Sequence, residues 1–173
     1  MDNLEEIGQL IRNKNYRFIG VDGTNGAGKS TMASKLSKAI GLTHINLDDF
    51  LNKKQGGYLE FLKYDEIKRK ISELDSYIVD GVCLMKVLGK IQISIDCLIY
   101  VKRMRHGIWS DEEECNIDGD VEEFIKKEKE VLAMIDKTDV LPESLGLAEE
   151  IIHYHAEYKP HEKADIFFER NDC

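Results

Sequence analysis

A glycine-rich run near the N-terminus has the residue types and the spacing needed to hold phosphate groups. The run is Gly23-Thr24-Asn25-Gly26-Ala27-Gly28-Lys29-Ser30-Thr31, and it satisfies the pattern GxxxxGK[ST] in full. Glycines let a backbone approach phosphate oxygens without a Cβ clash, and successive N–H groups then point inward. Lys29 can reach the β- and γ-phosphates, and the Ser30 hydroxyl can bind Mg²⁺. The sequence therefore predicts that residues 23–31 bind a nucleotide.

Carboxylates follow two later apolar runs. Asp48 and Asp49 come directly after Ile45-Asn46-Leu47, and Asp80 ends the run Tyr77-Ile78-Val79. We predict that Asp48 takes a proton from an attacking hydroxyl or orients it toward the γ-phosphate. Asp49 is either a helix cap or a Mg²⁺ partner. Asp80 is expected to act on the Mg²⁺ shell directly or through water, with a turn-forming Asp-Gly as the alternative.

Basic residues follow two more apolar runs, the one at 95–101 and the last one at 165–169. Arg103 and Arg105 lie in Val101-Lys102-Arg103-Met104-Arg105-His106, and Arg170 comes near the C-terminal end. Arg103 and Arg105 are predicted to neutralise charge on a transferring phosphoryl group if a loop closes over it. The start of a solvated basic helix is the alternative for these two residues. Arg170 is expected near the nucleotide base or ribose.

Two other groups of side chains have less specific patterns. His153 and His155 are two positions apart on an expected helix, where they face different ways, so we interpret them as surface histidines rather than as a metal pair. Tyr58, Phe61 and Tyr64 follow the predicted Asp48 loop. They either form a wall of an acceptor pocket or pack in the core.

Short β-rich apolar runs alternate with helical patterns, which is typical of an α/β protein with a parallel sheet. The expected strands are 17–22, 43–47, 77–79, 95–101 and 165–169. The expected helices are 1–15, 29–40, 64–74, 121–137 and 145–158. The helix at 121–137 is interpreted as a solvated outer helix with a thin apolar stripe at Phe124, Leu132 and Ile135. The acidic segment Gly107–Gly119 is predicted to be a mobile loop.

Length and composition limit the protein class. A chain of 173 residues with 42% apolar and 33% charged residues fits one folded domain. A net charge of −9 argues against a protein that binds long nucleic acid. No apolar run is long enough for a bilayer and no signal peptide is evident, so we expect no membrane association and a cytoplasmic location. The widely spaced cysteines are expected to be free thiols; they are Cys83, Cys97, Cys115 and Cys173.

Four motifs together give the chain a resemblance to a known family. They are GVDGTNGAGKST, INLDDF, YIVDG and EYKPHEKADIFFE. With these motifs the chain resembles the uridine kinase-like P-loop kinases, a group that also contains nicotinamide riboside kinases and bacterial pantothenate kinases. The resemblance implies a three-layer P-loop NTPase fold with a five-stranded parallel sheet, in the order 2-3-1-4-5, flanked by helices. The resemblance extends from about Arg17 to Arg170. We expect one P-loop kinase-like domain, residues 1–173, with an N-terminal helix at 1–15 and a lid-like loop region at about 103–120.

The resemblance also implies a chemistry. It implies a requirement for ATP and Mg²⁺, and it places Asp48 at the position of the carboxylate that activates the acceptor. Asp80 falls where these kinases often have Glu. The first hypothesis is therefore a kinase that transfers the γ-phosphoryl group of ATP to a hydroxyl of a nucleoside or similar metabolite. The alternative is a nucleotide-binding regulatory module that acts with a partner protein, motivated by the acidic segment Asp111–Asp120. A homo-oligomer is possible under both hypotheses.

Overall fold

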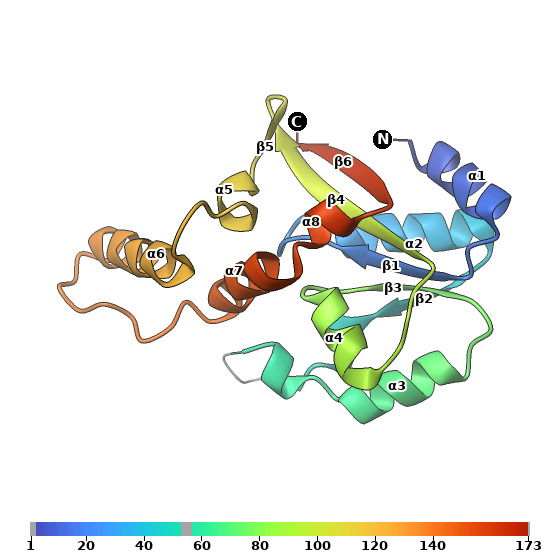
Figure 1. The fold of residues 1–173 in the computed structure, drawn as a ribbon, viewed down its shortest axis with the longest axis horizontal. Coiled ribbons are helices and arrows are strands. Elements are labelled where there is room, and N and C mark those ends of the chain that lie inside the picture. The colour runs from blue at the N-terminus through green and yellow to red at the C-terminus, as the bar shows by residue number, and fades with distance from the viewer. Residues whose placement is uncertain (1–2, 53–56, 173) are drawn as a thin grey trace.

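The centre of the fold is a mostly parallel sheet. The computed structural model describes residues 3–52 and 57–172. Within these ranges, the parallel strands lie in the order β2-β3-β1-β4-β6 (Figure 1). They are β1 (Phe18–Asp22), β2 (Thr43–Asn46), β3 (Tyr77–Asp80), β4 (Cys97–Arg105) and β6 (Ile166–Asp172). The predicted fold class and the predicted order of five parallel strands are thus confirmed.

One short strand was not predicted. β5 (Ile108–Trp109) pairs antiparallel with Met104 and Arg105 at the end of β4. β6 pairs with the same two residues from one edge of β4, so β5 must lie on the other edge, which β1 occupies as far as Tyr100. The hairpin of β4 and β5 therefore extends beyond the end of β1.

Helices cover both faces of the sheet, which makes three layers (Figure 1). The longer helices are α1 (Leu4–Lys14), α2 (Lys29–Ile40), α3 (Tyr64–Ser72), α4 (Leu84–Ile91), α6 (Val121–Ile135) and α7 (Leu147–Tyr158). The short ones are α5 (Glu112–Cys115), α8 (Pro160–Lys163) and the 3₁₀ turns η1 (Leu47–Phe50) and η2 (Leu59–Phe61). No helix in the described ranges is long and apolar enough to span a bilayer.

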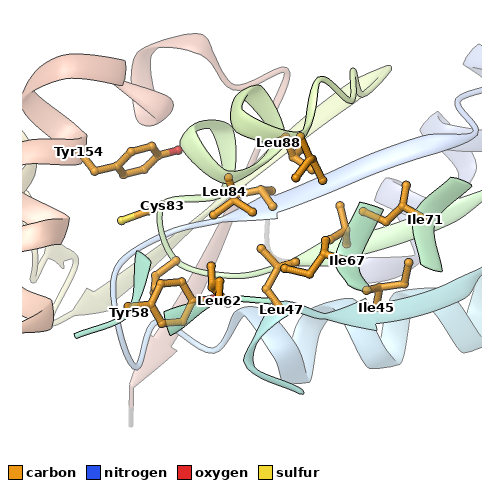
Figure 2. Packing of buried hydrophobic residues seen from close by; sticks show 14 of the residues in the cluster. Ile45, Leu47, Tyr58, Leu62, Ile67, Ile71, Cys83, Leu84, Leu88 and Tyr154 are labelled. Atoms are coloured by element: carbon orange, nitrogen blue, oxygen red, sulfur yellow. The ribbon is translucent and has the colours of Figure 1, made fainter. Parts of the chain in front are cut away.

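Each face of the sheet has its own core. On one face, α1 and α2 pack their buried side chains, Ile7 and Leu36 among them, against Ile19 and Ile99 of the sheet. On the other face, α3, α4 and α7 pack against β2 and β3. Figure 2 shows this second core, in which Leu47, Ile67 and Leu84 lie between the sheet and the helices. In both α2 and α3 the buried apolar side chains lie four residues apart on one helix face; they include Met32 and Leu36 in α2, and Ile67 and Ile71 in α3.

Two regions differ from the sequence expectations. The helix α4 was not predicted. It begins at Leu84, directly after its N-cap residue Cys83, which has left-handed conformation with φ of 53°. In α6, the predicted apolar stripe is wrong: Ile125 and Ala133 are the buried residues, whereas Leu132 and Ile135 are 39% and 69% exposed. The residues that α6 buries are therefore not those of the predicted stripe.

The segment Gly107–Gly119 is not the patternless loop that its acidic composition indicates. It contains β5 and α5, and it buries Trp109, Asp111 and Cys115. Asp111 is paired with a cation and Cys115 with a tyrosine hydroxyl, which satisfies these polar atoms inside the fold. Cys83, Cys97 and Cys115 are free thiols as predicted, and Cys173 lies outside the described residues.

Candidate active site

The predicted nucleotide loop lies between β1 and α2. The strand ends at Asp22 and the helix begins at Lys29, so the N-terminus of α2 points into the loop. The first turn of α2 has no acidic residue and no side-chain cap, which leaves its backbone N–H groups free for an anion. Gly28 has a φ of 95°, and a Cβ there would lie 2.8 Å from the Arg170 side chain. The loop therefore has the shape and the polarity that a phosphate requires.

Lys29 is buried at the bottom of the loop. Its side chain is held by the Thr24 carbonyl oxygen, to which Nζ donates at 2.7 Å, and the residue is only 7% exposed. Burial lowers the pKa of Lys29, while the charges of Asp22, Asp80 and Asp48 act in the opposite direction. These three carboxylates come from the ends of β1, β3 and β2, as expected for the carboxyl edge of a parallel sheet.

Asp22 was not among the predicted site residues. It is the last residue of β1, and its charge acts on Lys29. It is fully buried; Oδ1 accepts from the Gly23 N–H at 2.7 Å and Oδ2 accepts from the Tyr154 hydroxyl. Burial raises the pKa of Asp22 to about 6, against the lowering effects of Tyr154, Gly23 and Lys29. Its position immediately before the first glycine of the loop was the available sequence signal. Tyr154 on α7 gave no such signal.

Ser30 and Asp80 lie next to each other beside Lys29. The Ser30 hydroxyl donates to Asp80 Oδ2 at 2.6 Å, and Asp80 Oδ1 lies 2.5 Å from His44 Nε2. Hydroxyl and carboxylate oxygens are ligands that Mg²⁺ prefers, and it completes its shell with water and substrate phosphates. In the described ranges, no group of three or more His, Cys, Asp or Glu side chains could hold a metal alone. This pair of oxygen donors has the chemistry that Mg²⁺ bound together with a nucleotide would need, and the metal-binding roles of Ser30 and Asp80 stay predictions.

Asp48 lies on the other side of the same cavity. A cavity of about 520 Å³ is lined by the nucleotide loop, by Asp80 and by Asp48. Asp48 is exposed, and its Oδ1 accepts from the Tyr58 hydroxyl at 3.0 Å. Tyr58 is buried, and its backbone N–H donates to Glu150 of α7. Among the three aromatic residues considered from the sequence, Tyr58 is the one that lines this cavity.

The remaining predicted residues divide into two groups. Arg170 lines the cavity, and its NH1 donates to the Gly26 carbonyl at 3.0 Å. Arg103 lies beside the loop, where it is paired with Asp111 at 2.5 Å. Asp49 and Arg105 are exposed and are not among the described residues that line the cavity. Their roles in metal binding and in catalysis stay predictions.

Asp49 is not the helix cap considered from the sequence. The turn η1 is capped by Asn46, whose Oδ1 accepts from the Asp48 N–H at 2.9 Å. Asn46 precedes the two aspartates and has the extended conformation that a cap requires, with ψ of 121°. This cap fixes the backbone at Asp48 and leaves both carboxylates free of a capping role.

The interpretation of His155 as a surface residue is wrong. His155 is 1% exposed, and its Nε2 lies 2.8 Å from the Tyr100 hydroxyl. Burial lowers the pKa of His155 to about 4, so the ring is neutral at pH 7. Because Nδ1 faces the Ile151 carbonyl at 2.8 Å, Nδ1 carries the proton and Nε2 accepts from Tyr100. His153, by contrast, is partly exposed as expected.

Comparisons with known proteins give distant structural similarities. No protein-family model matches the chain, and no curated protein matches it. A shikimate kinase from Aquifex aeolicus vf5 is 15% identical over 87% of this chain and 85% of its own, with a TM-score of 0.45. A shikimate kinase from Acinetobacter baumannii in complex with shikimate is 12% identical over 96% and 89%, with a TM-score of 0.47.

A third solved structure is an uncharacterized protein from Eubacterium ventriosum ATCC 27560. It is 14% identical over 88% of this chain and 87% of its own, with a TM-score of 0.43. At these identities and TM-scores, the similarities establish neither a family nor a substrate for this chain. The resemblance to uridine kinase-like kinases therefore stays a prediction.

Proposed function

We propose that this protein is an ATP-dependent kinase that transfers the γ-phosphoryl group of ATP to a hydroxyl of a nucleoside or similar metabolite. The observation that carries the proposal is one cavity of about 520 Å³ that is lined both by the nucleotide loop and by Asp48. A protein that only binds a nucleotide needs the loop, whereas a carboxylate that faces it across a cavity is suited to an acceptor hydroxyl.

The side chains of the donor half have distinct roles in this proposal. Lys29 and the N-terminus of α2 hold the phosphates and stabilise the negative charge that develops during transfer. Ser30 and Asp80 would hold Mg²⁺, which supplies charge neutralisation on the β- and γ-phosphates when it is bound. His44 holds Asp80 at Oδ1 and leaves Oδ2 directed toward Ser30.

The acceptor half has fewer fixed groups. Asp48 is placed to accept the proton of the hydroxyl or to direct its oxygen in line with the donor phosphate. Tyr58 donates to Asp48 and remains protonated, since burial and the Asp48 charge both raise the pKa of Tyr58. The resemblance to uridine kinase-like kinases supports a nucleoside-like acceptor.

The first test is an assay of the purified protein with ATP and Mg²⁺ against a panel of nucleosides and vitamins. The proposal predicts that at least one acceptor raises ADP release above the acceptor-free rate, and that Lys29→Ala removes this increase. Lys35→Ala removes the same charge at an exposed position of the same helix and should retain the increase. Binding of ATP without any stimulation by the panel contradicts the proposal.

The alternative is a nucleotide-dependent regulatory module, and a pair of variants separates the two functions. In cells, a regulatory module should lose its function with Lys29→Ala and keep it with Asp48→Asn. A kinase should lose its function with both variants, because its reaction needs Asp48 to activate the acceptor. A regulatory module has no acceptor for Asp48 to activate. The result that supports the kinase is loss of function in Asp48→Asn while nucleotide affinity stays unchanged.

A further inference from the structure

Asp111 is a buried carboxylate that has no assigned part in the proposed reaction. It is 4% exposed, and it precedes the short helix α5 in the segment after the β4–β5 hairpin. A buried carboxylate costs free energy unless both of its oxygens are satisfied, and an apolar side chain of similar size would avoid that cost. Its presence beside the nucleotide loop therefore needs an explanation in terms of its contacts.

Those contacts connect the hairpin to the nucleotide loop. Asp111 Oδ2 accepts from the Thr24 hydroxyl at 2.7 Å, and Oδ1 accepts from Arg103 NH2 at 2.5 Å. Thr24 is the second residue of the loop and is itself buried. Arg103 is on β4, and its carbonyl accepts from the Ser110 N–H at 2.9 Å, which closes the hairpin. One carboxylate thus joins the loop, the strand and the hairpin.

The backbone of Thr24 also contacts Lys29. The Thr24 carbonyl oxygen accepts from Lys29 Nζ at 2.7 Å and from the Ala27 N–H at 3.3 Å. A bound phosphate attracts the ammonium group, so the Thr24 carbonyl loses or lengthens its bond to Lys29 when a nucleotide binds. The side chain of Thr24 remains held by Asp111. A change of the backbone at Thr24 would therefore act on Asp111 and, through Asp111, on the hairpin.

We propose that Asp111 is a positioning residue for the nucleotide loop, and that its bonds to Thr24 and Arg103 couple nucleotide binding to the β4–β5 hairpin. The inference rests on the nucleotide binding in the proposed function and does not require phosphoryl transfer. Arg103 has a defined part in this coupling: it neutralises Asp111 and is held next to the loop.

The chain contains a natural reporter for this coupling. Trp109, its single tryptophan, lies in β5 two residues before Asp111. It is 8% exposed, it packs edge-to-face on Tyr100 with 5.9 Å between ring centroids, and the Lys102 ammonium lies 4.3 Å from its ring centroid. Because indole emission depends on such neighbouring charges and rings, a shift of the hairpin changes the fluorescence of Trp109.

The experiment measures Trp109 emission while the full-length protein is titrated with ADP in the presence of Mg²⁺, and ADP affinity is measured separately by calorimetry. The wild-type chain should give a saturable change of emission. Asp111→Asn and Thr24→Val should each weaken ADP binding by about tenfold. Both variants should also lose the change of emission at saturating ADP.

Matched variants separate positioning from a general loss of structure. Thr24→Ser keeps the hydroxyl and should restore both the affinity and the change of emission. Glu113→Gln makes the same change of charge as Asp111→Asn at an exposed position of α5, and should behave as the wild type. Thermal unfolding of each variant without nucleotide shows whether it is folded. If Asp111→Asn does not fold, the comparison of Thr24→Val with Thr24→Ser decides the outcome.

Wild-type affinity in Asp111→Asn and Thr24→Val, or unchanged Trp109 emission when ADP binds to the wild-type protein, overturns the inference. ADP binding with the predicted emission change but without phosphorylation of any acceptor removes the proposed kinase function and leaves this inference intact. Absence of ADP binding to the wild-type protein overturns both.

Discussion

The two sides of the central cavity hold their charged groups in opposite ways. On the nucleotide side, Asp22, Lys29 and Asp80 are all buried, and each has hydrogen-bond partners within the fold. On the acceptor side, Asp48 is exposed and is held through the hydroxyl of Tyr58. The nucleotide side is thus fixed before a ligand arrives, whereas the carboxylate of the acceptor side keeps contact with solvent.

The buried and the exposed charges differ in their effect on the stability of the fold. Buried charges destabilise a fold but act strongly on a bound phosphate, since solvent does not screen them. An exposed carboxylate costs little and can adjust to a hydroxyl. Variants on the nucleotide side should therefore change both binding and stability, and variants on the acceptor side should change turnover alone.

The largest effect is expected for Lys29→Ala. Loss of the buried ammonium removes the main cation of the nucleotide side, so we expect phosphoryl transfer to fall by about 10³-fold and nucleotide affinity to fall with it. Steady-state kinetics and ADP calorimetry measure the two effects. Lys35→Ala, an exposed lysine on the same helix, is the control and should remain active. Transfer by Lys29→Ala at a rate close to that of the wild type would remove the nucleotide loop from the mechanism.

The second effect concerns the stability of the nucleotide side. Because burial raises the pKa of Asp22 to about 6, above the value of ~3.9 in an unfolded chain, the folded state binds this proton more tightly. The contribution of Asp22 to stability is therefore full below pH ~4 and is lost as the pH rises through about 6.

Asp22→Asn should remove this loss of stability at high pH, because the amide side chain does not ionise. We expect an increase of about 1–3 kcal/mol in the free energy of unfolding at pH 8, which disappears below pH ~4. Denaturant unfolding at both pH values measures the difference. An Asp22→Asn chain that is less stable than the wild type at pH 8 would show that the ionised carboxylate stabilises the fold.

The smallest effect is expected for Tyr58→Phe on the acceptor side. The variant removes the hydroxyl that donates to Asp48 and keeps the buried ring, so kcat should fall by about threefold to tenfold while ADP affinity stays constant. Tyr64→Phe is a matched control, because the Tyr64 hydroxyl donates to the Leu59 carbonyl instead. A loss of ADP affinity in Tyr58→Phe would mean that the two sides of the cavity are not independent.

The nucleotide loop and the sheet around it were predictable from the sequence for a physical reason. A GxxxxGK[ST] run works between a strand and a helix, and Phe18–Val21 and Met32–Ile40 have the matching apolar spacing. The carboxylates Asp48 and Asp80 follow apolar runs directly, so the rule that ligands bind at the carboxyl ends of strands located them.

The supporting residues were not predictable in the same way. His44, Asp111 and Tyr154 reach the site from β2, from the hairpin segment and from α7, and only tertiary packing brings them there. The interpretation of His155 failed for the same reason, because its partner Tyr100 is distant in sequence. The helix α4 was missed since it has only eight residues and contains Gly89, which weakens a helical pattern.

The most direct test of the account compares wild type and Asp48→Asn for ADP affinity and for acceptor-stimulated ADP release, measured on the same preparations. We predict equal ADP affinity in the two proteins and a fall of about 10²-fold in acceptor-stimulated release for Asp48→Asn. Acceptor-stimulated release that is equal in both proteins would contradict the account, because Asp48 would then have no part in activating the acceptor.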